Sequence, residues 1–129
     1  MGAIRAVNQD LAAPALWTAF TTLDWTDALP DDVRDYLRYI HEQNAGCNEL
    51  IRKECLDLGR ILSVAGAGAV VLKGATWLFE DGPARADRMM RDVDILVDRD
   101  WLDGARAALA DAGYTPVPTI VAEKGHVHD

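Results

Sequence analysis

The chain has 129 residues, a length that suits one small domain and is too short for two of ordinary size. Half of its residues are hydrophobic and 26% are charged, which excludes collagen-like, intrinsically disordered and membrane-spanning classes. Its 13 Lys and Arg against 21 Asp and Glu give a formal charge of −8, and the average field of such a protein repels phosphate backbones. We therefore expect a soluble globular protein, and a nucleic-acid partner is disfavoured.

Two observations indicate a cytoplasmic protein. The N-terminal sequence MGAIRAVNQD lacks the basic and then apolar pattern of a secretory signal, and no apolar run approaches the roughly 20 residues that cross a bilayer. Cys47 and Cys55 fall in a helical pattern that would hold their Cα atoms ~12 Å apart, beyond the reach of a disulfide. Two reduced thiols agree with a cytoplasmic location, and we expect no membrane partner.

The N-terminal half is predicted to be helical. Leu16, Phe20 and Leu23 recur at three- to four-residue spacing behind Pro14, which suits the first turn of a short helix. Residues 25–30 then form a link to the next helical pattern.

That second helical pattern is much longer. Asp31 or Asp32 can cap it, and its apolar stripe covers residues 33–62. The stretch Asn-Ala-Gly at 44–46 is its one weak point, so the segment is either a single long helix or two helices that meet at a bend.

Beyond residue 63 the pattern changes to short elements. An apolar run bounded by glycines predicts a buried strand at 69–72, and a short helix is predicted at 74–80. The loop DGPARADRMM, rich in turn formers and arginine, precedes a second predicted strand at 92–97.

The last predicted elements are a helix and two strand fragments. Asp100 and Asp103 resemble a capping pair for a helix that ends at Gly113. The fragments at 114–117 and 120–121 are confined by neighbouring prolines to a sheet edge or a bend.

The segment RMMRDVDILV carries the most chemical information. Successive side chains of an extended chain alternate faces, so Asp92, Asp94 and Leu96 point one way and the intervening apolar residues point the other. The polar face places two carboxylates ~7 Å apart at the backbone, where their oxygens can converge on one or two divalent cations. Such hard ligands favour Mg²⁺ or Mn²⁺ over zinc. The alternative is that these aspartates only cap or solvate the end of a strand.

Lys73 and Gly74 lie where the first predicted strand gives way to the short helix. Backbone N–H groups and the helix dipole can hold phosphate oxygens at such a point, and glycine allows a close approach. Taken alone, a Lys-Gly pair is also typical of an ordinary turn.

Together these motifs resemble the uncharacterised nucleotidyltransferase-like family of the DNA polymerase β superfamily. The family pattern is a Leu-Lys-Gly strand end, then Arg-x-x-x-Asp-hydrophobic-Asp-hydrophobic-Leu-Val, a helix, and Gly-Tyr. A helix carrying Asn48, Glu49 and Leu50 resembles the family's lead-in, so the likeness covers roughly residues 44–115. The residues that match the main pattern are Leu72, Lys73, Gly74, Arg88, Asp92, Asp94, Leu96, Val97, Gly113 and Tyr114.

The resemblance implies an α/β fold of the α+β type, a polymerase β-like nucleotidyltransferase fold. In it, N-terminal helices precede a mixed sheet of few strands that has helices on one face and an open nucleotide cleft on the other. It divides the chain into a helical segment at 1–63 and a nucleotidyltransferase-like core at 64–129, and a C-terminally incomplete core is one of the alternatives.

The resemblance also implies the transfer of a nucleoside monophosphate from an NTP to a small-molecule, peptide or protein acceptor. In that reaction Asp92 and Asp94 would be catalytic and would bind Mg²⁺ or Mn²⁺. Gly74 would contact the triphosphate through its backbone, and Lys73 or Arg88 would offset phosphate charge.

Two departures from the superfamily pattern leave other functions open. Ala75 follows Gly74, where Gly-Ser or Gly-Gly is usual, so the turn has no hydroxyl for a phosphate. The superfamily also needs a third carboxylate, for which Glu123 and Asp129 are the candidates. The alternatives are a catalytically inactive nucleotide-binding or protein-interaction module of the same fold, and a helical interaction protein that uses its long apolar stripe.

Two further groups of side chains have competing interpretations. His126 and His128 can share a face and bind a transition metal, but a frayed chain end is the simpler explanation. Arg85, Arg88 and Arg91 form the main basic cluster, which either grips a nucleotide phosphate or stays solvated.

Overall fold

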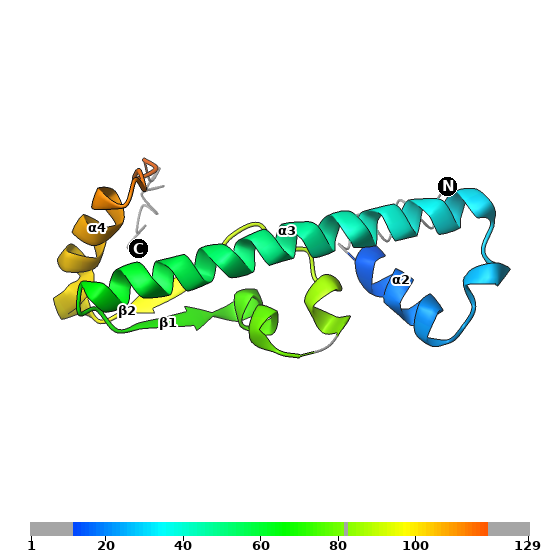
Figure 1. Ribbon diagram of the computed structural model, residues 1–129, viewed down its shortest axis with the longest axis horizontal. Helices are drawn as coiled ribbons and strands as arrows, with labels where there is room; N and C mark the ends of the chain where they lie inside the picture. Colours follow the sequence, from blue (N-terminus) through cyan, green and yellow to red (C-terminus); the bar gives the residue numbers. More distant parts are fainter. Residues whose placement is uncertain (1–11, 82, 119–129) are drawn as a thin grey trace, which may run out of the picture.

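The computed structural model describes residues 12–81 and 83–118 (Figure 1). Its helices and strands, in chain order, are α2 (Ala13–Thr22), α3 (Asp31–Val64), β1 (Ala69–Leu72), β2 (Asp94–Val97) and α4 (Leu102–Asp111). Short 3₁₀ segments stand between them at Thr26–Ala28, Lys73–Phe79, Pro83–Ala86 and Arg99–Trp101. In the described part of the chain, no helix has both the length and the apolar character that crossing a membrane requires.

The long helix α3 organises the fold. Figure 1 shows α2 beside its N-terminal half, with the strands and α4 toward its C-terminal end. The helix is unbroken at residues 44–46, so the single-helix alternative is correct. One side chain of that stretch, Asn44, is buried, and its tertiary contacts offset the weak helix propensity. The buried side chains share one face of α3: Leu37, Asn44, Asn48, Cys55, Leu58 and Leu62.

Helices α2 and α3 differ in how they begin. Pro14 lies in the first turn of α2, as predicted. The long helix α3 has Pro30 at its N-cap and no side-chain cap, while Asp31 and Asp32 lie in its first turn. These two carboxylates face the positive end of the helix dipole, so they favour this end electrostatically rather than as a cap.

Strands β1 and β2 form a two-stranded antiparallel sheet in which Ala69 pairs with Val97 and Leu72 pairs with Asp94. The first strand is confirmed at its predicted position, but it is not buried: Ala69 and Val70 are exposed, because the sheet formed by the described residues has only two strands and leaves this part of β1 uncovered. The second begins at Asp94 rather than at residue 92, because the partner strand ends opposite Asp94. The described residues therefore contain helices and a small sheet, which is compatible with the α+β class. This sheet is antiparallel and not mixed as predicted, because its two strands run in opposite directions.

The apolar side of residues 93–97 packs into two small core clusters. The first consists of Cys55, Ala75 and Leu78, with Ile51, Val71, Met90 and Val93 against it. The second consists of Leu62, Ala67 and Ala105, with Ile95, Val97 and Leu109 against it. Val93, Ile95 and Val97 thus face the core while Leu96 is exposed, which confirms the predicted alternation.

The start of α4 differs from the prediction. The Asp98 carboxylate accepts a hydrogen bond from the backbone N–H of Asp100 at 3.0 Å and caps the 3₁₀ segment Arg99–Trp101, which leads directly into the helix. The predicted capping pair Asp100 and Asp103 is therefore wrong, because the chain turns into helical geometry two residues earlier and Asp98 takes the cap.

The end of α4 follows the prediction. Gly113 has a φ of +99°, a backbone conformation that stops the helix and favours glycine. Tyr114 then donates a hydrogen bond to the Glu54 carboxylate on α3, and this bond, with burial and the carboxylate charge, raises the pKa of Tyr114 to about 12.

Residues 114–118 form no strand, so the fragment predicted there is wrong. Its two prolines lack the N–H donors of a ladder. The fragment predicted at 120–121 lies outside the described residues.

The two cysteines are both free thiols, as expected, but their surroundings differ. Cys47 is exposed, whereas Cys55 is buried in the first core cluster. Burial, and to a smaller extent the charge of Glu54, raises the pKa of the Cys55 thiol.

The continuity of α3 can be tested at Gly46. A Cβ placed there meets nothing within 4 Å. We expect Gly46→Ala to raise the free energy of unfolding by about 1 kcal/mol, because alanine loses less backbone entropy in a helix. Gly113→Ala should lower it, because alanine does not tolerate that positive φ. Urea titration of both variants measures the difference, and a destabilised Gly46→Ala protein would mean that the helix bends at residue 46.

Candidate functional site

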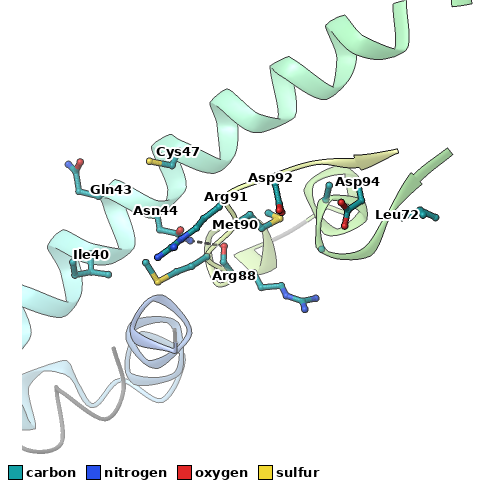
Figure 2. Close-up of a pocket in the computed structure, with 13 residues that line it drawn as sticks. Ile40, Gln43, Asn44, Cys47, Leu72, Arg88, Met90, Arg91, Asp92 and Asp94 are labelled. Carbon is teal, nitrogen blue, oxygen red and sulfur yellow. Dashed lines mark hydrogen bonds between the residues drawn. The ribbon is translucent and has the colours of Figure 1, made fainter. Parts of the chain in front are cut away.

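A cleft of about 480 Å³ is lined by α3, by the turn that follows β1, and by the segment that leads into β2. Figure 2 shows the side chains of that last segment lying opposite the α3 residues. The lining residues are Ile40, Gln43, Asn44, Cys47, Leu72, Gly74, Ala75, Arg88, Met89, Met90, Arg91, Asp92 and Asp94.

Asp92 and Asp94 both line this cleft (Figure 2). Asp92 is exposed and lies two residues before β2, while Asp94 is the first residue of the strand and is half-buried. Val93 between them faces the core. The alternation predicted from sequence therefore brings two carboxylates to one open wall, where both could serve as ligands of a divalent cation.

Lys73 is paired with one of these carboxylates. Its Nζ lies 2.7 Å from Asp94 Oδ2, and the two side chains are 78% and 42% exposed. The hydrogen bond and the charge of Asp94 raise the pKa of Lys73, and Asp92 adds a smaller effect of the same sign. The Lys73 ammonium is charged at neutral pH, so it neutralises part of the charge of the two carboxylates.

The turn after β1 has its unusual backbone at Lys73 rather than at Gly74. Lys73 has a φ of +57°, in the left-handed region that side-chain-bearing residues rarely adopt. The Thr76 hydroxyl donates a hydrogen bond to the Lys73 carbonyl at 2.6 Å and closes the turn. The short helix predicted at 74–80 is a 3₁₀ helix, Lys73–Phe79.

Gly74 lies where the chain passes closely beneath Met90 and Arg88. A Cβ on Gly74 would lie 3.4 Å from the Met90 sulfur and 3.9 Å from the Arg88 guanidinium carbon. The absence of a side chain on Gly74 therefore leaves room for the Met90 and Arg88 side chains. The next residue, Ala75, is buried in the first core cluster. A small apolar residue at this position is explained by packing, since its side chain serves the core.

The three arginines of the loop have separate roles in the structure. Arg88 lines the cleft and its guanidinium lies 6.0 Å from the centre of the Trp77 ring, within cation–π range. Arg91 also lines the cleft. Arg85 instead donates to the Glu80 carbonyl at 2.5 Å and pairs with Asp81. The basic cluster predicted from sequence is thus divided, and two of its members reach the site.

Two buried asparagines on α3 hold this loop in place. The Asn44 amide donates to the carbonyls of Ala86 and Arg88 at 2.7 and 3.0 Å. The Asn48 amide donates to those of Arg85 and Arg88 at 2.5 and 2.8 Å. From the sequence, Asn48 is notable only within the family likeness, and Asn44 only as part of the weak helical stretch at 44–46. The available signal was a pair of amides four residues apart on a face that is otherwise apolar.

Helix α2 reaches the same loop from the other side. The Thr18 hydroxyl donates a hydrogen bond to the Asp87 carboxylate at 2.5 Å. The loop that carries Arg88 is therefore held by polar contacts from two helices, although it has no regular secondary structure beyond the 3₁₀ segment Pro83–Ala86.

The two carboxylates of the cleft are suitable ligands for a hard divalent cation, but they are only two. Asp92 and Asp94 offer carboxylate oxygens on one wall, and Asp94 Oδ2 is already paired with the Lys73 ammonium. Within residues 12–81 and 83–118, no group of three or more His, Cys, Asp or Glu gathers in metal-binding geometry. Glu123 and Asp129, the candidates for a third carboxylate, lie outside the described residues, as do His126 and His128.

Comparison with known families identifies the chain's relatives. A family model described as uncharacterised nucleotidyltransferase matches residues 2–128. The chain belongs to this family. Neither the curated proteins nor the solved structures that were compared with it gave a match. Membership of the uncharacterised nucleotidyltransferase family confirms the resemblance inferred from the Lys-Gly and Asp-x-Asp motifs and supports nucleotidyl transfer as the general reaction.

The clamp on the loop can be tested at Asn48. Asn48→Ala removes two hydrogen bonds from a buried site, so we expect the free energy of unfolding to fall by about 2 kcal/mol. Gln43→Ala is the matched control, because Gln43 is an exposed amide on the same helix; its effect should stay below about 0.5 kcal/mol. Denaturant unfolding of both variants measures this difference, and equal effects would show that the buried amide contributes nothing specific.

Proposed function

We propose that this protein transfers a nucleoside monophosphate from a nucleoside triphosphate to an acceptor, with the help of a divalent cation. The acceptor is a small molecule, a peptide or a protein. One observation carries the proposal: in a member of a nucleotidyltransferase family, Asp92 and Asp94 line the same cleft as the Gly74 backbone and the Arg88 side chain.

Asp92 and Asp94 would hold the cation, Mg²⁺ or Mn²⁺, because these ions prefer carboxylate oxygens. Bound there, the cation would stabilise the negative charge that develops on the phosphate oxygens. Glu123 or Asp129 would supply the third carboxylate.

Positive side chains around the carboxylates would bind the triphosphate. Arg88 and Arg91 line the cleft, and Lys73 stands at its acidic end. Because the whole protein carries a formal charge of −8, attraction of a polyphosphate must be local, and these three groups supply it. The Gly74 peptide would contact a phosphate through its backbone, since glycine itself carries no side chain. Positioning and charge neutralisation of this kind provide most of the catalysis in phosphoryl chemistry.

The remaining wall of the cleft suits the organic part of a ligand. It is formed by the apolar side chains of Ile40, Met89 and Met90, with Cys47 and the amide of Gln43 beside them. Methionine side chains adapt to ligands of irregular shape, and the amide offers both a donor and an acceptor. Such a wall accommodates the sugar and base of a nucleotide more readily than a bare phosphate.

The reaction can be tested with each of the four NTPs in turn, with Mg²⁺ or Mn²⁺ present. We expect release of pyrophosphate or labelling of the protein by the nucleotide. Asp92→Ala or Asp94→Ala should lower this activity at least about 100-fold, because each removes a charge from the centre of the reaction. Asp111→Ala is the matched control, since Asp111 is an exposed carboxylate at the end of α4. Activity that survives both cleft substitutions would reject the assignment.

Nucleotide binding can be measured separately from transfer. A ligand at about 100 times its Kd stabilises the folded state by about 2.7 kcal/mol, so Mg²⁺ with the preferred NTP should raise the melting temperature by several degrees. Arg88→Ala should reduce that shift, whereas Arg106→Ala, an exposed arginine on α4, should leave it intact. A shift without turnover would favour the inactive nucleotide-binding module, and no shift with any NTP would contradict both functions.

A further inference from the structure

We propose that Lys73 acts as an exchangeable counter-ion for Asp94, so that the cleft takes up a complex of metal and nucleotide in preference to the free metal ion. This inference rests on the proposed function and specifies the form in which its substrate binds. When the cation arrives, the Lys73 ammonium leaves Asp94. The ammonium then pairs with a phosphate oxygen of the same incoming complex.

The sheet register fixes Lys73 beside Asp94. Leu72 is the pairing partner of Asp94, and Lys73 is the residue that follows Leu72. The Nζ to Oδ2 distance of 2.7 Å is that of a hydrogen-bonded ion pair. Lys73 directly follows β1 and Asp94 is the first residue of β2, so their contact depends on the fold and not on local sequence spacing.

The backbone of Lys73 also favours this placement. A lysine at a φ of +57° is strained relative to a glycine, and the Thr76 hydroxyl holds its carbonyl at 2.6 Å. Strain of this kind persists only where surrounding contacts determine the conformation, and it gathers at functional sites. If Gly74 were the left-handed residue, the turn would carry no such strain, because glycine adopts a positive φ freely. The left-handed residue is nevertheless Lys73.

The ion pair is weak enough to exchange. The Lys73 side chain is 78% exposed and that of Asp94 is 42% exposed, and ion pairs in water contribute little to stability. A free divalent ion that takes Asp94 Oδ2 displaces the ammonium from this oxygen and leaves it without its carboxylate partner. A metal–nucleotide complex supplies another partner, because its phosphates are anionic.

The proposal predicts that one substitution changes the affinities for two ligands in opposite directions. Lys73→Met keeps the length of the side chain and removes its charge. We expect it to bind Mn²⁺ alone about fivefold more tightly than the wild type, because the competing ammonium is gone. We expect it to bind Mn²⁺ together with an α,β-methylene nucleoside triphosphate about fivefold more weakly, because a phosphate partner is lost. Electron paramagnetic resonance of free Mn²⁺ measures both affinities without requiring turnover.

Two control variants separate this exchange from a general charge effect. Lys53→Met makes the same change in net charge at an exposed position of α3 outside the cleft, so both affinities should remain within about twofold of the wild type. Lys73→Arg keeps the cation beside Asp94 and should retain the weak binding of Mn²⁺ alone. A melting curve for each variant confirms that it is folded.

The outcomes distinguish the exchange from the proposed function. The exchange is wrong if Lys73→Met binds Mn²⁺ alone no more tightly than the wild type, or if the substitution strengthens both affinities. If the wild-type protein binds Mn²⁺ but none of the four nucleotide analogues, the proposed function is rejected instead. In that case, the affinities of the wild type and of Lys73→Met for Mn²⁺ alone still decide whether Lys73 competes for Asp94.

Discussion

The cleft depends on the two buried amides of α3 that hold the loop before β2. Asn44 and Asn48 donate four hydrogen bonds to backbone carbonyls at residues 85–88, and both side chains are almost fully buried. Buried carbonyls without donors are costly, so these bonds determine the path of the chain. That path sets where Arg88 and Arg91 enter the cleft and where the chain turns into the extended segment of Asp92. One face of α3 thus organises a site to whose lining the helix contributes no charged side chain.

Local periodicity predicted much of the fold and of the site from sequence. The alternation of residues 92–97 placed two carboxylates on one wall and three apolar side chains in the core, and the structure has the same arrangement. The helical stripe of α3 was visible for the same reason. Such patterns repeat within a few residues, so no long-range contact is needed to recognise them.

The missed features depend on contacts between distant parts of the chain. The amide of Asn44 binds carbonyls more than 40 residues away, and nothing in the local pattern identifies that partner. The pairing of Lys73 with Asp94 required the register of two strands, which the sequence does not fix. The cap at Asp98 was missed because three aspartates lie within six residues and any of them suits the position.

The two cysteines, which face such different surroundings, make the protein convenient to study in solution. Cys47 is exposed on the cleft wall, whereas Cys55 is buried and its thiol has a raised pKa, so a maleimide reagent reacts preferentially with the first. A fluorophore attached there would lie on the cleft wall, and protection of Cys47 from the reagent would report a bound ligand with no engineered residue. Screening of acceptor molecules can therefore begin with the natural sequence, before any assay of the chemical reaction exists.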